Sequence, residues 1–390
     1  MTDAFLTNSD IAELTEWRRE LHRHPELSGE EIETARRVVD MLKATTPDEI
    51  ITGLGGHGVA AVYESGREGP AVLLRCELDG LPIEELNPDL PYRSTVAGKG
   101  HLCGHDGHMT IIAATARWLG RNRPDRGQVI LMFQPAEEDG SGAQKTIDDP
   151  RYGTITPDYS FALHNFPGVP LGHAALTAGP MNCASRGMRV RLTGRTAHAS
   201  QPEKGLSPAP ALASLLTSLP ALGLGDDAAD PEFALVTVTH AHLGEQAFGI
   251  APGAAEIWVT LRTQKDGAMN TLVAQAEALV TQAANASGLH HDISYDDIFN
   301  HCENEEEATQ LLSDALEAEG IPMARAEFPM RGSEDFGRFR TSSKSAMFLL
   351  GSGTNCANLH NPDFNFPDDL IGVGARVFVR ALKNLCYDKE

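Results

Sequence analysis

The chain has 390 residues, a formal net charge of -22, 41% hydrophobic residues and 6% aromatic residues. This length and hydrophobic content fit two globular domains with sizeable cores and exclude a mostly disordered chain. The acidic balance argues against nucleic acid and membrane as partners, because either would call for basic patches.

The N-terminal region predicts two amphipathic helices. Ser9 is expected to cap the first helix, and residues 28–31, Ser-Gly-Glu-Glu, resemble a capping box for the second. His22 and His24 are expected on the polar face of the first helix. The apolar face of that helix is predicted from residues at spacings of three and four: Ile11, Leu14, Trp17 and Leu21.

Short apolar runs then alternate with helical segments. Helices are expected over residues 108–119 and 369–385. The runs mostly lack period-two alternation, which is typical of strands buried on both faces of a sheet. This order predicts an α/β fold with a mostly parallel sheet. The expected strands are residues 58–63, 71–76, 128–133, 159–163 and 346–350.

The middle of the chain has a different order of elements, βαββαβ, which matches a ferredoxin-like α+β unit. We therefore expect an inserted domain at residues 184–297, with the catalytic domain formed by residues 1–183 and 298–390. The expected elements are strand 187–192, helix 206–219, strands 233–239 and 255–262, helix 269–286 and strand 291–295.

The N-terminal residues, the length of the apolar segments and the cysteines indicate the cellular compartment. The first ten residues have no basic stretch followed by an apolar run, and no segment reaches the roughly 18 apolar residues of a membrane span. Six widely spaced cysteines fit free thiols in a reducing compartment. The sequence thus predicts a cytoplasmic protein.

Polar clusters follow four of the predicted strands. Parallel strands bring their carboxyl ends to one edge of a sheet, where α/β proteins bind their ligands, so these clusters are expected to converge. The potential metal ligands among them offer one thiolate, three imidazoles and one carboxylate: Cys103, His105, Glu138, His164 and His360. Five ligands exceed the four of one tetrahedral ion and suggest two divalent ions with a bridging thiolate. Zn²⁺ is favoured, and Mn²⁺, Co²⁺ or Ni²⁺ stay open. A purely structural zinc site is the alternative.

Two neighbouring carboxylates have expected roles. Glu137 precedes Glu138, and on an extended backbone successive side chains point apart, so one carboxylate binds metal and Glu137 remains for general acid/base work. Asp79 is expected to orient a ligand or position the metals, with a helix cap or turn as its alternative. His101 and His108 are expected either to support the ligands or to cap the following helix.

His198 follows an alternating strand of the predicted insertion. It lies in a Gly-Arg-Thr-Ala-His-Ala-Ser-Gln-Pro stretch, residues 194–202, that predicts a loop at the end of the small sheet. From there its imidazole could donate to a developing oxyanion. The alternative is an ordinary surface histidine.

These residues resemble a known family, the M20 metallopeptidases, and in particular its amidohydrolase branch of aminoacylases, hippurate hydrolases and auxin-conjugate hydrolases. The resemblance runs nearly end to end. Its carriers are residues 18–26 (RRELHRHPE), 77–83 (ELDGLPI), 103–108 (CGHDGH), 134–138 (QPAEE), 198–202 (HASQP), 332–336 (GSEDF) and 359–362 (LHNP).

The resemblance implies the same two-metal site, with Glu137 as general base and then acid. It further implies that the insertion is a lid that mediates a homodimer or a dimer-based oligomer, with His198 offered to the active site of a neighbouring subunit. The expected reaction is hydrolysis of the amide of an N-acyl amino acid. A dipeptidase or carboxypeptidase of the same clan is the alternative, and a non-enzymatic scaffold is the third reading.

The chain departs from the family pattern in the lid. Residues 249–252 are Gly-Ile-Ala-Pro where the family commonly has Asn-x-Ile-Pro, so a side-chain amide that would touch the substrate is missing. Glu77 replaces the first aspartate of the Asp-Met-Asp motif, and Asp139 begins the usual glycine-rich run. Arg262 becomes the candidate for holding a substrate carboxylate.

Overall fold

The computed structural model describes residues 5–388. The chain forms two compact units: unit 1 comprises Met1–Gly179, Glu303–Glu327 and Asp335–Glu390, and unit 2 comprises Pro180–Cys302 and Phe328–Glu334. Unit 2 is thus wider than the expected insertion at residues 184–297 and takes in a second segment. The first four residues of the segment considered for a signal peptide lie outside the described residues. Among residues 5–388, no helix has the length and apolarity of a bilayer span.

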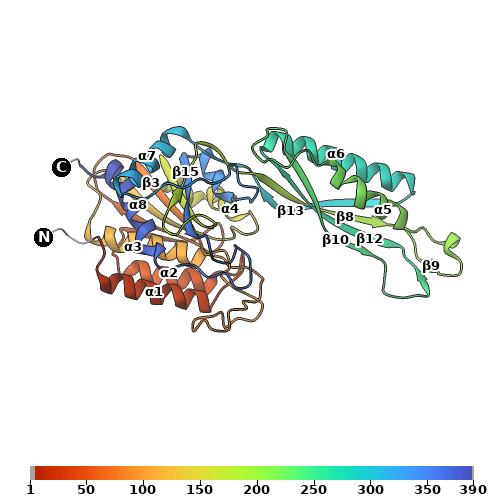
Figure 1. The fold of residues 1–390 in the computed structure, drawn as a ribbon, viewed down its shortest axis with the longest axis horizontal. Coiled ribbons are helices and arrows are strands. Elements are labelled where there is room, and N and C mark those ends of the chain that lie inside the picture. Colours follow the sequence, from red (N-terminus) through yellow and green to blue (C-terminus); the bar gives the residue numbers. More distant parts are fainter. Residues whose placement is uncertain (1–4, 389–390) are drawn as a thin grey trace. The chain divides into compact units, whose positions relative to one another are not determined.

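Unit 1 is built on a seven-stranded sheet in the order β1-β2-β4-β3-β5-β15-β6. Figure 1 labels β3 and β15 of this sheet, together with helices of unit 1 such as α3 and α8. β3, β4, β5 and β15 are parallel, β1 shares their direction, and β2 and β6 run the other way. The expected mixed α/β fold with a mostly parallel sheet is confirmed. The strands are β1 (Glu49–Leu54), β2 (Gly58–Glu64), β3 (Ala71–Glu77), β4 (Gln128–Gln134), β5 (Tyr159–Pro167), β6 (Ala174–Ala175) and β15 (Lys344–Gly353).

The central strands are buried on both faces, which explains their missing alternation. Leu74 and Leu131 join the core that contains α3 and α8, while their neighbours Leu73 and Met132 are also fully buried. The helices of unit 1 are α1 (Asn8–Arg23), α2 (Ile32–Lys43), α3 (His105–Arg121), α4 (Gly142–Asp148), α7 (Glu306–Ala318) and α8 (Leu370–Cys386). The short 3-10 helices are η1 (Pro150–Thr154) and η4 (Asp335–Thr341).

Two expected helix caps are wrong. Thr7 caps α1 in a reciprocal capping box with Asp10, whereas the Ser9 hydroxyl donates to Glu13 within the helix. Glu31 is the N-cap residue of α2 but its side chain does not cap the helix; the Glu26 carboxylate accepts from the Glu33 and Thr34 N–H groups instead. The Ser28 hydroxyl donates instead to Asp79, and the Glu31 carboxylate accepts from backbone groups elsewhere. Ser28 and Glu31 thus form hydrogen bonds with residues distant in sequence instead of the local capping box.

Unit 2 contains the order βαββαβ around a four-stranded antiparallel sheet, β10-β12-β8-β13. Both helices pack on one face of this sheet, over a core of residues such as Val190, Leu215 and Leu261. Helix α5 begins later than expected, at Ala209, because Pro208 disfavours helical conformation at Ser207 before it. The elements are β8 (Ala184–Thr193), α5 (Ala209–Ser218), β10 (Ala234–Leu243), β12 (Ala254–Thr263), α6 (Asp266–Ala286) and β13 (His290–Phe299).

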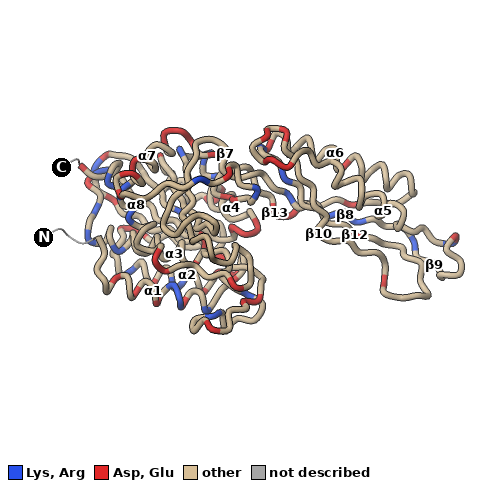
Figure 2. The backbone as a smooth tube through the Cα atoms, viewed as in Figure 1, with Lys and Arg blue, Asp and Glu red and all other residues tan. Residues whose placement is uncertain are grey.

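Short elements complete the fold. β9 (Ala197–His198) pairs with β11 (Ile250–Ala251), and β7 (Gly179–Asn182) pairs with β14 (Cys302–Asn304). Short 3-10 turns are η2 (Pro202–Lys204) and η3 (Pro220–Leu222). Acidic and basic residues are spread over both units, but helices α5 and α6 carry almost none (Figure 2).

Candidate metal centre

The carboxyl ends of the parallel strands bring the expected residues together. Asp79 lies just beyond β3, Glu137 and Glu138 lie beyond β4, and His164 lies within the last part of β5. Cys103 comes from the loop before α3, and His105 is the first residue of that helix. His360 lies in the loop after β15, in the left-handed conformation at φ 65°, and its N–H donates to the Leu102 carbonyl at 2.8 Å.

The five expected ligands form two groups that share one thiol. Ligand atoms of Cys103, His105 and His164 all lie within 4.8 Å of one another, and so do those of Cys103, Glu138 and His360. Cys103 Sγ is 3.5 Å from His164 Nε2, and His360 Nε2 is 3.6 Å from Glu138 Oε2. Two overlapping donor sets around one sulfur match two cations bridged by a thiolate.

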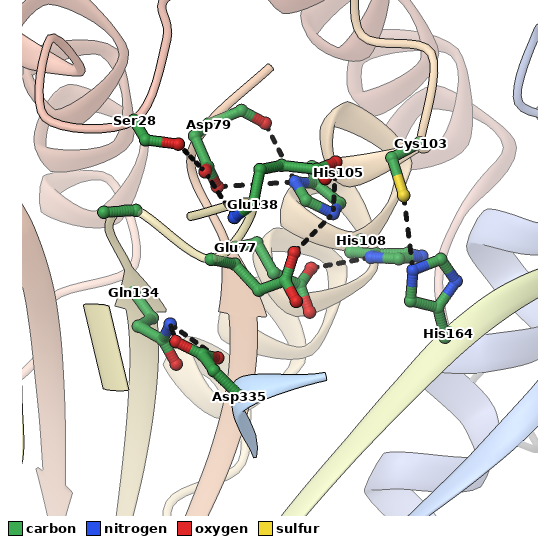
Figure 3. Close-up of polar contacts among 12 residues, drawn as sticks. Ser28, Glu77, Asp79, Cys103, His105, His108, Gln134, Glu138, His164 and Asp335 are labelled. Atoms are coloured by element: carbon green, nitrogen blue, oxygen red, sulfur yellow. Dashed lines mark hydrogen bonds and ion pairs between the residues drawn. The ribbon is translucent and has the colours of Figure 1, made fainter. Parts of the chain in front are cut away.

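The histidines point their lone pairs into this space. His105 Nδ1 donates to the Asp79 carbonyl at 2.8 Å (Figure 3). His164 Nδ1 donates to the Asn165 carbonyl at 2.7 Å. A ring nitrogen that donates to a carbonyl carries the proton, so Nε2 of each neutral ring is an acceptor. Metal-binding histidines are held in this way in proteins. Among the described residues, buried His105 Nε2 makes no hydrogen bond, as expected of a nitrogen awaiting a cation.

Glu137 and Glu138 lie in a turn, so the expected extended backbone is wrong. The Gly140 N–H donates to the Glu137 carbonyl at 2.8 Å, and Ala136 before the pair has φ 51°. Both carboxylates approach His105 Nε2, each with one oxygen at 3.8 Å. The second oxygen of Glu138 faces His360, which leaves Glu137 as the carboxylate outside the two Cys103 groups.

Asp79 connects two of the expected ligands. Its Oδ2 accepts from the Glu138 N–H at 2.9 Å and from the Ser28 hydroxyl at 2.8 Å, while its carbonyl holds His105 (Figure 3). No helix begins beside it in the described chain, since α3 starts at His105. The geometry therefore favours the positioning role over the helix-cap alternative.

The electrostatics of the cluster favour added positive charge. Burial opposes protonation of His105, but Asp79, Glu77 and Glu138 outweigh it and raise the pKa of this imidazole to about 10. Burial and the carboxylates of Glu138 and Glu137 raise the pKa of the Cys103 thiol well above its usual value. A divalent cation supplies the charge that these carboxylates favour and deprotonates a coordinating thiol.

A second buried network of hydrogen bonds and ion pairs lies next to the expected ligands. His108 Nδ1 is 2.6 Å from Glu77 Oε2, and its Nε2 accepts from the Asn165 N–H at 3.1 Å. Because Nε2 accepts from the Asn165 N–H, Nδ1 is the ring nitrogen that donates to Glu77, and His108 holds the backbone next to His164. Arg75 pairs with Glu77 and with Asp335, and the latter also accepts from Gln134. Of the two supporting histidines expected from the sequence, His108 makes these contacts, whereas buried His101 makes no hydrogen bond within the described residues.

The remaining expected residues lie in unit 2. His198 is exposed in β9, and its Nδ1 accepts from the Ser200 N–H at 3.1 Å and lies 2.8 Å from the Ser200 hydroxyl. Arg262 in β12 is partly buried and donates to the Arg331 carbonyl and the Ser333 hydroxyl.

Sequence reasoning missed several residues that support the site. His22 is fully buried rather than on a polar face, and it contacts Asp106 at 2.8 Å. Gly104 has φ 94°, and a Cβ there would lie 2.1 Å from the Asn165 side chain. One sequence signal could have indicated that His22 is buried in a polar network. Residues from Arg18 to Glu26 are rich in charge, and this run overlaps the first predicted helix.

Comparison with known proteins shows the family to which the chain belongs. The chain belongs to Peptidase family M20/M25/M40, whose model matches residues 73–384. It is 30% identical to the hippurate hydrolase of Campylobacter jejuni, covering 94% of this chain and 95% of the relative. It is 27% identical to an N-acetylcysteine deacetylase of Bacillus subtilis, covering 94% of each chain. A crystal structure of a Bacillus subtilis protein, a dinuclear metal binding peptidase from the M20 family, superposes with a TM-score of 0.78 at 25% identity, covering 96% and 98%.

Proposed function

We propose that this protein hydrolyses the amide bond of N-acyl amino acids or related conjugates and releases a carboxylic acid and an amino acid. The observation that carries the proposal is the pair of donor groups, Cys103 with His105 and His164, and Cys103 with Glu138 and His360. The related hippurate hydrolase and N-acetylcysteine deacetylase support an acylated amino acid as the substrate class. The enzyme class is a metal-dependent amidohydrolase.

The proton transfers belong to Glu137. Two divalent ions held by the five ligands would polarise the scissile carbonyl and acidify a water. The Glu137 carboxylate, at the edge of the ligand groups, takes a proton from the attacking water and delivers it to the departing amine. Asp79 acts through His105 and Glu138 and is a positioning residue. Zn²⁺ is our proposed metal, because a thiolate and imidazoles suit it, with Mn²⁺, Co²⁺ and Ni²⁺ as alternatives.

His198 and Arg262 are proposed to bind substrate. The Ser200 N–H must donate to His198 Nδ1, so the neutral ring carries its proton on Nε2. That N–H can donate to the oxyanion of the reaction. Among the described residues, Arg262 has no carboxylate partner, and burial lowers its pKa, so a substrate carboxylate would complete its contacts.

We also propose that unit 2 is the lid and mediates a homodimer. The exposed residues of α6 are uncharged in a chain of net charge -22: Gly267, Asn270, Thr271, Ala274, Gln275, Ala278, Thr281, Gln282, Asn285 and Ala286. Depletion of charge is typical of interface cores. We further propose a cytoplasmic location.

A hydrolysis screen tests the reaction. N-acetyl and N-benzoyl amino acids and unmodified dipeptides are supplied to protein reconstituted with Zn²⁺, Mn²⁺, Co²⁺ or Ni²⁺, and the released amino acid is measured. We expect release from the acylated amino acids. Release from dipeptides alone would replace the proposal with the dipeptidase or carboxypeptidase alternative, and fewer than about one ion per chain after resupply would favour the scaffold reading.

Glu137→Gln tests the proton transfer. The amide keeps the shape of the side chain but cannot accept the proton, so kcat should fall by about 10²–10⁴ while metal content is unchanged. Asp139→Asn is the matched control, because this carboxylate lies in the same turn and accepts from the Ser141 N–H. Parental turnover in Glu137→Gln would disprove the assignment.

A further inference from the structure

We propose that Glu31 is a positioning residue of the metal centre, whose buried carboxylate fixes the turn that carries Glu137 and Glu138. It stands 105 residues earlier in the chain than Ala136, at the start of α2. The effect on turnover rests on the proposed function, whereas the effects on the turn and on metal binding do not.

The contacts of Glu31 are made with backbone groups. Its side chain is fully buried, and Oε1 accepts from the Ala136 N–H at 2.8 Å and from the Gly29 N–H at 2.9 Å. The first bond joins it to the residue immediately before Glu137. A buried carboxylate that accepts backbone N–H groups is a strong hydrogen-bonding partner.

The turn needs such a partner because Ala136 has φ 51°, a conformation that residues with a Cβ rarely adopt. On its other side, the Ala136 carbonyl accepts from the Gly142 N–H at 2.9 Å, and a Cβ on Gly142 would lie 1.6 Å from the Pro135 carbonyl oxygen. Glu31 thus holds one side of a tightly packed turn. The proposed general base Glu137 and the proposed metal ligand Glu138 project from this turn.

Residues next to Glu31 form hydrogen bonds with the Asp79 segment, which also positions the site. The Ser28 hydroxyl donates to Asp79, which accepts from the Glu138 N–H, and the Gly80 N–H donates to the Glu26 carbonyl at 2.8 Å. Residues 26–31 therefore bind both the Asp79 segment and the Ala136 turn. Within this segment the Ser28 and Glu31 side chains serve the centre, whereas the Glu26 carboxylate accepts from the Glu33 and Thr34 N–H groups at the N-terminus of α2.

The test compares Glu31→Ala, Glu31→Gln and the control Glu30→Gln. Glu30 is the exposed neighbour and pairs with Lys99. Hydrogen exchange of the peptide containing Ala136 should become faster in Glu31→Ala only, since the amide oxygen introduced by Glu31→Gln can still accept. Chelator competition with Zn²⁺ and Co²⁺ should show about 10-fold weaker binding in Glu31→Ala and less than about 3-fold change in the other two variants.

Ala136→Gly provides a second, independent test. Glycine adopts positive φ without steric cost, so it should leave turnover of the parent little changed. In the Glu31→Ala background it should recover about 3-fold or more of the lost kcat for an N-acyl amino acid, with KM unaltered. A residue that only stabilises the fold would lower the unfolding temperature without this rescue.

Several outcomes would overturn the proposal. These are unchanged exchange at Ala136 in Glu31→Ala, equal loss of metal affinity in Glu31→Ala and Glu31→Gln, or absence of rescue by Ala136→Gly. If Glu31→Ala does not fold, faster exchange at Ala136 in Glu31→Asp, whose shorter side chain keeps the charge, carries the same test. If the parent binds no metal, the proposed function fails, while the exchange measurement still decides the role of Glu31.

Discussion

Units 1 and 2 bury different kinds of side chain. In unit 1, charged groups such as Arg18, Arg75, Glu77 and Asp106 are fully buried around the candidate metal centre. In unit 2 the core between the four-stranded sheet and its helices is apolar, and Arg189 on that sheet stays at the surface. Burial of charge is costly unless every charge is paired. The difference indicates that unit 1 accepts this cost to position ligands, whereas unit 2 is held together mainly by its hydrophobic core.

The largest expected effect comes from removing one buried charge. Arg75→Met leaves the carboxylates of Glu77 and Asp335 without their shared partner. We expect a loss of about 3–5 kcal/mol in the free energy of unfolding. The matched control is Arg189→Met in unit 2, whose cation lies 4.4 Å from the Trp258 ring and pairs with Asp296 at the surface. It should cost less than about 1 kcal/mol.

Urea unfolding with hydrogen exchange as a second readout distinguishes the two units. Equal losses for Arg75→Met and Arg189→Met would contradict the comparison, because the two arginines would then matter alike in spite of their different burial.

His22 gives a smaller, pH-dependent effect. Burial opposes its charge, but Asp106 and Glu85 outweigh burial and raise the pKa of His22 to about 8 from the ordinary 6.5. A folded-state pKa above the unfolded value stabilises fully below about pH 6.5, and the stabilisation is lost as pH rises through 8. The upper bound is about 2 kcal/mol.

The measurement is the difference in unfolding free energy between the parent and His22→Asn at about pH 6 and about pH 9, on either side of this window. We expect this difference to shrink toward the higher pH. A difference that stays constant with pH would show that the ring contributes by packing alone.

The smallest effect on stability is expected in unit 2. Ala278→Glu places a charge on the exposed, uncharged face of α6 and should change the free energy of unfolding by less than about 0.5 kcal/mol. Its mass by light scattering should fall from dimer to monomer, whereas Thr237→Glu, on exposed β10, should leave the mass unchanged. A dimer that persists in Ala278→Glu would place the interface elsewhere.

The strands were predictable because burial on both faces leaves a continuous apolar run, as in residues 71–74 and 129–133. Placing polar residues beyond the carboxyl ends of these strands predicted that Cys103, Glu138 and the other expected ligands would gather at one sheet edge. The helix caps were not predictable. Ser28 and Glu31 match a local capping motif, but in the structure their side chains form hydrogen bonds with Asp79 and with the Ala136 N–H.

The sequence by itself determined the α/β architecture, the βαββαβ order of the second unit and the chemical types of the candidate ligands, because periodicity and residue type are local properties. Only the tertiary structure decided which nitrogen of each histidine faces the centre, that Glu137 and Glu138 lie in a turn, and that His22 is buried against Asp106. The His105–Asp79, His22–Asp106 and Glu31–Ala136 hydrogen bonds join residues 26, 84 and 105 positions apart, so a local pattern carries no record of them.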